Sequence, residues 1–384
     1  MTPTPRTPRT PRTPRAPRVD PADRAGLPSP DDGNPARSAR ASRLRRRAGV
    51  VGAVVVALAG CAAGGSASSG PADAPGTADA PGVTLRVGPL STQNLLTLAV
   101  DDGLAAEHVA AAGATLDVSA PFPAFAPAAE ALAAGHVDVV SGSTTAVVAA
   151  LAGDPDLVVV AVEHDAGDTQ GIVAHGAVAG DLADLAGRSV AVNKGGTGEY
   201  LLRLALRRAG LTPADVRIEY LGPPDAASAF AAGQVDAWAT WDQYLVGAQA
   251  LPGVRTLALA RDLASDNRTV HVTTRDVLER HPAAVAALYA ALVAEAEALA
   301  ADPGRRVAAY RDAGASDAVA AALGELAPPT VGPADATFAA ELARVADLYA
   351  AEGMVPAPVD VSGAAVDVMT LPAATPAART RPAG

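Results

Sequence analysis

The chain of 384 residues contains a single cysteine, Cys61. One cysteine excludes a disulfide scaffold, a cysteine-rich zinc site and an iron–sulfur cluster. The six histidines lack the spacing of a metal-binding motif such as H-E-x-x-H, and the sequence has no G-x-S-x-G pattern of a hydrolase. Aromatic residues make up only 3% of the chain, so an aromatic residue in a polar loop is a candidate for ligand contact. We therefore expect no metal and no cofactor.

Basic residues are scarce outside the first part of the chain. Residues 1–60 carry 12 arginines and 4 aspartates, whereas the remainder carries 37 acidic and 18 basic residues. A body with this excess of negative charge repels a phosphate backbone, which argues against nucleic-acid binding. Hydrophobic residues make up 49% of the chain, so a sizeable core is expected.

The first 60 residues have the features of an export signal. Four arginines precede an uncharged apolar run over residues 48–60, which is too short to span a bilayer but has the length of a signal-peptide core. The run ends in Leu58-Ala59-Gly60-Cys61, which resembles the bacterial lipobox. The resemblance implies that Cys61 becomes the lipid-modified mature N-terminus. The alternative is a buried core cysteine.

Composition sets the other boundaries. Residues 1–60 are interpreted as an N-terminal extension and lipoprotein signal peptide, and residues 1–40 contain Thr-Pro-Arg repeats that cannot form a packed core. Apart from Cys61 and Thr77, residues 61–82 are Ala, Gly, Ser, Pro and Asp, a composition typical of a flexible linker. A low-complexity tail is expected over residues 366–384. The folded part is therefore predicted over residues 83–365.

An internal repeat organises this folded part. Residues 131–138 (ALAAGHVD) and 229–236 (AFAAGQVD) nearly match. In each copy an alanine-rich helix is expected to end at a glycine, Gly135 or Gly233, and a strand follows at once. Reading backwards from each copy gives the same order of strand, helix, strand, helix and strand. A chance match in an alanine-rich chain is the alternative.

Two β-α-β-α-β units predict an α/β protein with two lobes and mainly parallel sheets around a central cleft. We expect residues 83–175 and 268–365 to form lobe 1 and residues 176–267 to form lobe 2. Ligands of such sheets bind beyond the carboxyl ends of the strands.

Polar loops follow the strands of both units. The glycine loop over residues 193–200 opens a helix, where Thr197 can act as a cap and the helix N-terminus favours an anion. Residues 91–93 and 142–145 occupy comparable places in the first unit. Each loop can also be only a turn or a cap. Trp238 is expected in the core, whereas Trp241 and Asp242 are expected in the cleft.

The stretches VAVNKGGT (190–197), LGPPDA (221–226) and VDAWATWD (235–242) resemble substrate-binding proteins of ABC importers. The most similar subgroup binds aliphatic sulfonates, taurine or nitrate. This resemblance implies a periplasmic-binding-protein-like type II fold whose cleft closes on its ligand. It also implies a set of ligand-binding residues: Ser91, Thr92, Gln93, Ser143, Thr144, Gly195, Gly196, Thr197, Trp241, Asp242 and Asn267. The chain departs from this subgroup at Gly196, where a serine is common, and at Gln243, where a proline is common.

The resemblance implies a monomeric, lipid-anchored receptor on the extracytoplasmic face of a bacterial membrane. It would bind a small anionic sulfonate and deliver it to the permease and ATPase subunits of the importer. Nitrate, bicarbonate and a thiamine-pyrimidine precursor are alternative solutes. Enzymes with a similar fold include desulfinases with a cysteine nucleophile, but the only cysteine here is the expected lipidation site. A ligand-binding module of a sensor or adhesion system is a third hypothesis.

Overall fold

The computed structural model describes residues 82–176, 178 and 180–371. The expected signal peptide, the lipidation site Cys61 and the linker as far as residue 81 lie outside the described residues. So does the part of the expected tail that begins at residue 372.

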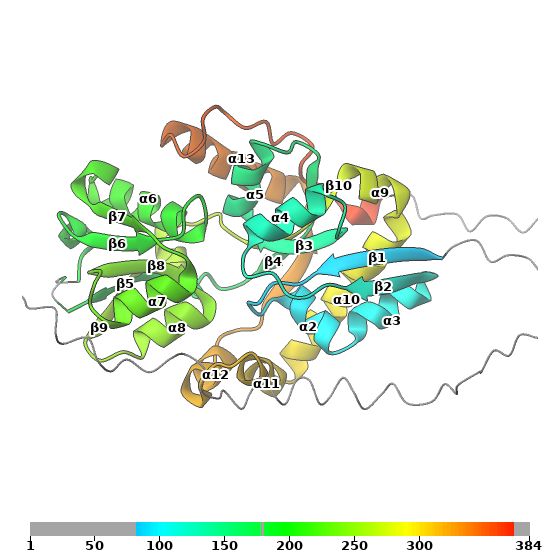
Figure 1. Ribbon diagram of the computed structural model, residues 1–384, viewed down its shortest axis with the longest axis horizontal. Coiled ribbons are helices and arrows are strands. Elements are labelled where there is room, and N and C mark those ends of the chain that lie inside the picture. The colour runs from blue at the N-terminus through cyan, green and yellow to red at the C-terminus, as the bar shows by residue number, and fades with distance from the viewer. Residues whose placement is uncertain (1–81, 177, 179, 372–384) are drawn as a thin grey trace, which may run out of the picture. The chain divides into compact units, whose positions relative to one another are not determined.

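The first copy of the repeat forms half of a six-stranded sheet (Figure 1). Its elements are β1 (Val83–Gly88), α2 (Leu95–Asp101), α3 (Leu104–Ala111), β2 (Ala114–Val118), α4 (Phe125–Ala133) and β3 (Val139–Ser143). β1 pairs in parallel with both β2 and β3. Helix α4 is followed by Gly135 at φ +69°, a left-handed conformation that glycine adopts without steric cost.

The second copy repeats this order in a five-stranded sheet. Its elements are β6 (Ser189–Val192), α6 (Thr197–Ala209), β7 (Arg217–Tyr220), α7 (Pro223–Ala231) and β8 (Ala237–Trp241). β6 pairs in parallel with β7 and β8, and Gly233 follows α7 at φ +67°. The predicted repeat is therefore confirmed.

Both sheets are mixed rather than mainly parallel. The remaining strands are β4 (Leu157–His164), β5 (Gln170–His175), β9 (Val254–Leu259), β10 (Thr269–Thr274) and β11 (Thr330–Pro333). The first sheet has the order β11-β4-β10-β3-β1-β2 and the second β7-β6-β8-β5-β9. β10 runs antiparallel to β3, and β5 antiparallel to β8, because each strand that follows a crossing begins at the edge of the sheet where this neighbour ends.

The chain crosses from the first sheet to the second earlier in the sequence than expected. β5 pairs with β8 and β9, so residues 170–175 belong to the second sheet and not to the first lobe. The first crossing therefore lies between β4 and β5, and the second between the 3₁₀ turn Ala260–Leu263 and β10.

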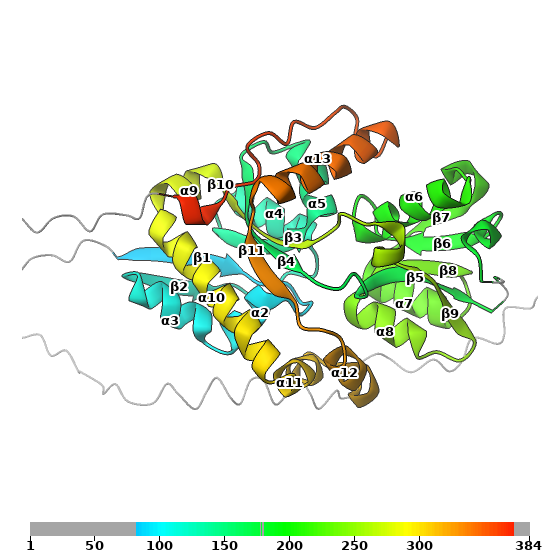
Figure 2. The same cartoon turned by 180° about the vertical axis from the view of Figure 1, so that it is seen from behind.

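Helices cover the faces of both sheets (Figures 1 and 2). Around the first sheet are α5 (Thr144–Leu151), α9 (Arg275–Arg280), α10 (Pro282–Ala301) and α13 (Ala336–Ala351). α8 (Asp242–Gln249) packs on the second sheet, and α12 (Asp317–Gly324) contacts α8, whereas α11 (Gly304–Asp312) follows α10. The α11–α12 pair therefore forms a third connection between the elements around the first sheet and those around the second.

Helix α10 is a core helix. Among the described residues it alone has the length and apolarity of a membrane span. However, Leu288, Ala291, Leu292 and Leu299 of this helix are buried in the core of the first sheet. Val368 is buried in the same core, so the folded part extends beyond residue 365 to at least Leu371. The expected tail therefore begins later than residue 366.

Candidate functional site

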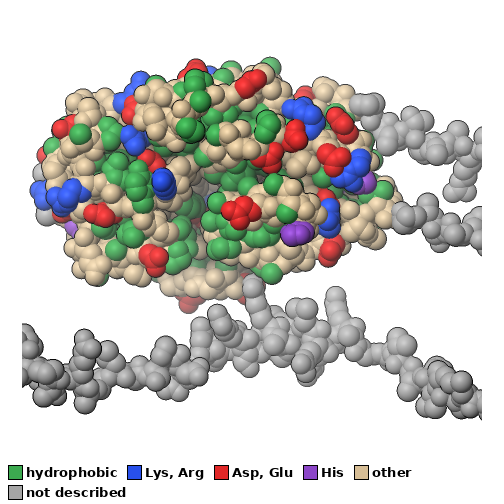
Figure 3. Space-filling view, turned by 45° about the horizontal axis from the view of Figure 1, so that its top comes forward, with side chains coloured by type: hydrophobic (Ala, Val, Ile, Leu, Met, Phe, Trp, Pro, Cys, Tyr) green, Lys and Arg blue, Asp and Glu red, His purple; other side chains and the backbone are tan. Residues whose placement is uncertain are grey.

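A cavity of about 210 Å³ lies between the two sheets. The surface is hollowed there, with hydrophobic side chains on its rim (Figure 3). The cavity is lined by residues that follow β1, β3 and β4 of the first sheet, β6 and β8 of the second, and by parts of both crossings. The loops over residues 142–145 and 193–197 contribute to the same cavity, as the two-lobe interpretation requires.

The wall from the first sheet is built around the start of α5. Ser143 caps this helix, because its hydroxyl accepts a hydrogen bond from the Ala146 N–H at 3.3 Å. Gly142 lies against the ring of Phe125, and a Cβ atom at this position would lie 2.4 Å from the ring. Glycine therefore allows the aromatic side chain to form part of the wall. Thr92 and Gln93, in the loop after β1, line the cavity as well.

The wall from the second sheet is built around the start of α6. The Asn193 side chain, rather than Thr197, accepts the N–H of Gly198 at 2.8 Å. The Asn193 side chain also fills the space beside Gly196, where a Cβ atom would lie 1.9 Å from the amide nitrogen. A serine at position 196 would require Asn193 to move. Asn193 and Thr197, rather than Gly196, line the cavity on this wall.

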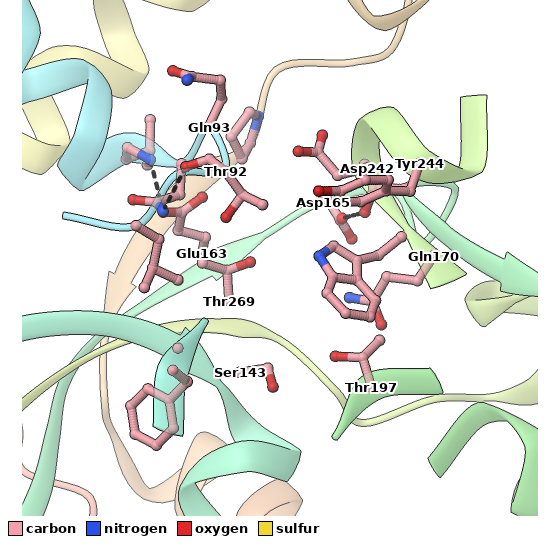
Figure 4. Close-up of a pocket in the computed structure, with 18 of the residues that line it drawn as sticks. Thr92, Gln93, Ser143, Glu163, Asp165, Gln170, Thr197, Asp242, Tyr244 and Thr269 are labelled. Atoms are coloured by element: carbon pink, nitrogen blue, oxygen red, sulfur yellow. Dashed lines mark hydrogen bonds between the residues drawn. The ribbon is translucent and has the colours of Figure 1, made fainter. Parts of the chain in front are cut away.

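Asn267 joins the two walls. Its Oδ1 accepts the N–H of Thr145 at 3.1 Å, and its Nδ2 donates to Thr197 Oγ1 at 3.0 Å and to Gln170 Oε1 at 2.9 Å. Asn267 is only 3% exposed. Because Thr197 accepts this bond, its own hydroxyl hydrogen is free for another acceptor. Figure 4 shows Ser143 and Thr197 on opposite walls of the cavity.

Asp242 is the first residue of α8 and has an unusual backbone conformation. Its φ is +53°, a left-handed value that aspartate and asparagine tolerate better than other residues. Its N–H donates to the Thr169 carbonyl at 2.6 Å, and Tyr310 on α11 donates its hydroxyl hydrogen to Oδ1. Oδ2 is buried and has no hydrogen-bond partner among the residues that the structure describes. Burial raises the pKa of Asp242 to about 6, although Tyr310 and Arg306 oppose the rise.

Other charged groups also line the cavity. Asp165 accepts from the Gly167 N–H at 2.9 Å and from the Thr169 hydroxyl. Glu163 accepts from the Leu95 N–H at 2.9 Å. Among the described lining residues, Arg306 is the one arginine or lysine, and it is 8% exposed.

The structure brings together most of the expected site residues. The cavity lining includes seven of them: Thr92, Gln93, Ser143, Thr197, Trp241, Asp242 and Asn267. Trp238 is 3% exposed and lies in the core, as expected.

Four expected residues do not line the cavity. Ser91 is exposed and donates to the Phe122 carbonyl at 3.2 Å, and the buried Thr144 bonds to the backbone of Arg268. Gly195 is held within its own loop, since its N–H donates to Glu199 at 2.9 Å. Gly196 is covered by the Asn193 side chain.

The sequence interpretation missed several lining residues. Asp165 and Thr169 belong to the first crossing and Gln170 begins β5, and the position of this crossing was misplaced by one strand. Arg306 and Tyr310 lie on α11, outside the repeat, where helical spacing alone gives no sign of a cleft. Tyr244 follows the Trp241-Asp242 pair by two residues and had the clearest signal, as an aromatic residue in a polar stretch.

The described residues contain no cluster of three or more His, Cys, Asp or Glu side chains that could hold a metal ion. They do contain a buried Ser141–His271–Glu163 chain. Ser141 is fully buried and does not line the cavity, so it cannot act as a nucleophile on a bound ligand.

Comparisons with known proteins agree with this architecture. Residues 110–306 match the family model described as NMT1/THI5 like. A protein of Escherichia coli (strain K12) named "Putative aliphatic sulfonates-binding protein" is 35% identical over 244 residues, which are 62% of this chain and 76% of that protein.

Two solved structures are similar over 74% of this chain, each with a TM-score of 0.68. The periplasmic aliphatic sulphonate binding protein SsuA from Escherichia coli is 30% identical, with 92% of it covered. The alkanesulfonate-binding protein SsuA from Xanthomonas axonopodis pv. citri, bound to MOPS, is 27% identical, with 98% covered. The chain therefore has the periplasmic-binding-protein fold and belongs to the NMT1/THI5-like family.

Proposed function

We propose that this protein is the solute-binding component of an ABC importer for small organosulfonates, either alkanesulfonates or taurine. It captures the sulfonate between its lobes and delivers it to a membrane permease. Family membership and the names of the similar proteins support this proposal.

The observation that carries the proposal is the arrangement around Asn267. This residue contacts the starts of α5 and α6, one from each sheet. Beside it, Thr197 keeps a hydroxyl hydrogen free, and Ser143, whose Oγ lies 2.9 Å from Thr145 Oγ1, presents its side chain from the other wall. A sulfonate has three equivalent oxygens that accept hydrogen bonds, so donors on two walls suit it better than donors on one.

Capture needs the lobes to close. A ligand that bonds to both walls favours the closed arrangement, because those contacts exist together only when the walls are near. The two crossings before β5 and before β10 are the natural hinges for this motion. No bond of the ligand has to be broken.

The cavity can accept an anion only if the negative charge of the carboxylates that line it is compensated. Arg306 supplies one positive charge at the cavity. Burial raises the pKa of Asp242 to about 6, which makes the loss of its proton harder. This carboxyl therefore carries less average charge than one with an ordinary pKa, and the difference is largest at pH values near and below 6.

Anchoring through Cys61 completes the proposal. A lipid on this cysteine and the linker over residues 61–82 would hold the receptor at the extracytoplasmic face of the membrane, near its permease. Mass spectrometry of the protein from bacterial membranes tests this part, and an unmodified Cys61 would contradict it.

A thermal-shift panel tests the solute. The full chain is mixed with taurine, alkanesulfonates, nitrate, bicarbonate and a thiamine-pyrimidine precursor. A true ligand at about 100 times its dissociation constant adds about 2.7 kcal/mol to the free energy of unfolding. A sulfonate is expected to give the largest shift; a shift with nitrate, bicarbonate or the pyrimidine alone would refute the proposal. Recovering the sulfonate unchanged after incubation excludes an enzyme.

The substitution Thr197→Val locates the binding site. It keeps the shape of the side chain and removes both the free hydroxyl hydrogen and the acceptor of the Asn267 Nδ2 bond. Sulfonate affinity should therefore fall by at least about tenfold, the value of one hydrogen bond to a charged group. Thr337→Val, at an exposed position on α13, is the matched control. Equal affinity in the two variants would remove the α6 start from the site.

A further inference from the structure

A chain of four buried polar side chains lies behind the cavity wall of the first sheet. Ser141 Oγ is 3.0 Å from Asn94 Oδ1 and 3.1 Å from His271 Nδ1. His271 Nε2 is 2.9 Å from Glu163 Oε1. Only the two ends of the chain, Asn94 and Glu163, reach the cavity. His271 is 1% exposed and has no direct access to a ligand.

The direction of each hydrogen bond follows from counting hydrogens. Asn94 Oδ1 accepts the N–H groups of Leu96 and Thr97, each at 3.1 Å, so this atom is the amide oxygen and has no hydrogen to give. Ser141 must therefore donate its single hydrogen to Asn94. Its oxygen then accepts from His271, which means that His271 Nδ1 carries a hydrogen.

One more proton is needed between His271 and Glu163. With a hydrogen already on Nδ1, a neutral imidazole presents a bare lone pair at Nε2 toward Glu163. The 2.9 Å contact then requires a hydrogen either on Nε2 or on the Glu163 carboxyl. In the first case an imidazolium faces a carboxylate, and in the second both groups are neutral. The pair has no net charge in either case.

We propose that His271 is a positioning residue for anion binding, which holds a proton that cancels the negative charge of Glu163 at the cavity. This inference rests on the proposed function, since it concerns how the same cavity accepts a sulfonate. Without that proton, Glu163 adds a full negative charge to the wall. The bound anion and the proton then stabilise each other.

The other charged groups near this pair are already engaged. Asp165 and Asp242 line the same cavity and would add to the repulsion, while Arg306 is bonded to the carbonyls of Leu326 and Ala327 at 3.4 and 3.3 Å. On α10, which packs against α2, the buried Glu295 is 3.6 Å from Arg305. None of these groups bonds to the Glu163 carboxyl, so His271 is the residue placed to compensate it.

Three variants of the full chain test the proposal with a sulfonate that the wild-type protein binds. His271→Gln keeps an amide donor near Glu163 but cannot hold the extra proton. At pH 8 its affinity should fall on the order of tenfold, as expected for an uncompensated charge in the same cavity. His164→Gln, at an exposed position on β4, is the control and should bind like the wild type.

The double variant Glu163→Gln, His271→Gln separates charge from structure. It removes the carboxylate as well, so its affinity at pH 8 should exceed that of His271→Gln by at least severalfold. Equal weakness of the two variants would show damage to the fold and overturn the proposal. Wild-type affinity of His271→Gln at pH 8 would also overturn it.

Nitrogen-15 NMR of the histidines in the ligand-free chain gives a second readout that does not depend on the solute. His271 should show a hydrogen on Nδ1 at pH 7, and the Nε2 signal should change in Glu163→Gln. An unprotonated Nδ1 refutes the inference even if the protein binds sulfonates. Failure of the wild-type chain to bind any sulfonate refutes the proposed function instead.

Discussion

Replacing Asn267 by leucine should weaken both the fold and the site, because this one side chain joins the two walls. Leucine has a similar volume but makes none of the three hydrogen bonds, which join Asn267 to Thr145, Gln170 and Thr197. Each buried hydrogen bond contributes about 1 kcal/mol, and partners left unpaired add to the loss. We therefore expect the free energy of unfolding to fall by about 3 kcal/mol.

Thermal unfolding of the ligand-free chain measures this change. For a domain of this size, 3 kcal/mol corresponds to a fall in Tm of about 6 °C. Gln234→Leu is the matched control, since it makes the same kind of replacement at an exposed position. If Asn267→Leu lowers the Tm no more than Gln234→Leu does, the side chain does not join the walls and the reasoning fails. Sulfonate affinity should fall in the same variant, because Thr197 loses the partner that orients its hydroxyl.

Two further substitutions test the walls separately. Gly142→Ala places a Cβ atom 2.4 Å from the Phe125 ring and should cost about 1–3 kcal/mol of stability by overpacking, whereas Gly222→Ala, with open space around it, should not. Asp242→Asn should stabilise the protein at high pH only. The pKa of Asp242 is raised to about 6 in the folded state, so the folded chain binds the proton more tightly than the unfolded chain. Stability therefore falls as pH rises from about 4 through 6, and the variant should gain about 3 kcal/mol over the wild type at pH 8 but nothing at pH 4. Denaturant unfolding at the two pH values checks this, and an equal difference at both would contradict it.

The parts of the fold that depend on neighbouring residues were predictable from the sequence. Gly135 and Gly233 each end a helix in the left-handed conformation, and a strand begins a few residues later in both copies. These signals are local, since glycine lacks the Cβ atom that penalises this conformation. The β-α-β-α-β order followed from them without knowledge of any long-range contact.

Pairings between distant segments were not predictable in the same way. β10 pairs with β3, and the paired residues His271 and Ser141 lie 130 positions apart. Nothing near either strand indicates which sheet it joins or in which direction it runs. For this reason β5 was assigned to the wrong lobe and the sheets were expected to be mainly parallel.

In the candidate site, too, residues with a local sequence signal were predictable and residues placed by long-range contacts were not. Ser143 and Thr197 follow strands at helix starts, and this position alone made them candidates. Arg306 and Tyr310 reach the cavity from α11, because α11 and α12 pack beside α8 and not because of any local motif. Glu163 is the last residue but one of the buried strand β4, and by its charge alone it would ordinarily be interpreted as solvated.

The charge of the cavity is the property that counting residues predicts least well. Glu163, Asp165 and Asp242 line it with a single arginine, which by formal charge would repel an anion. Two of the three carboxyls have a physical reason to hold less charge than their number implies. Burial raises the pKa of Asp242, and the hydrogen-bond pattern around Glu163 requires a proton between it and His271. Because both effects arise from burial and from contacts made across the fold, an anion-binding cleft can be built from an acidic sequence.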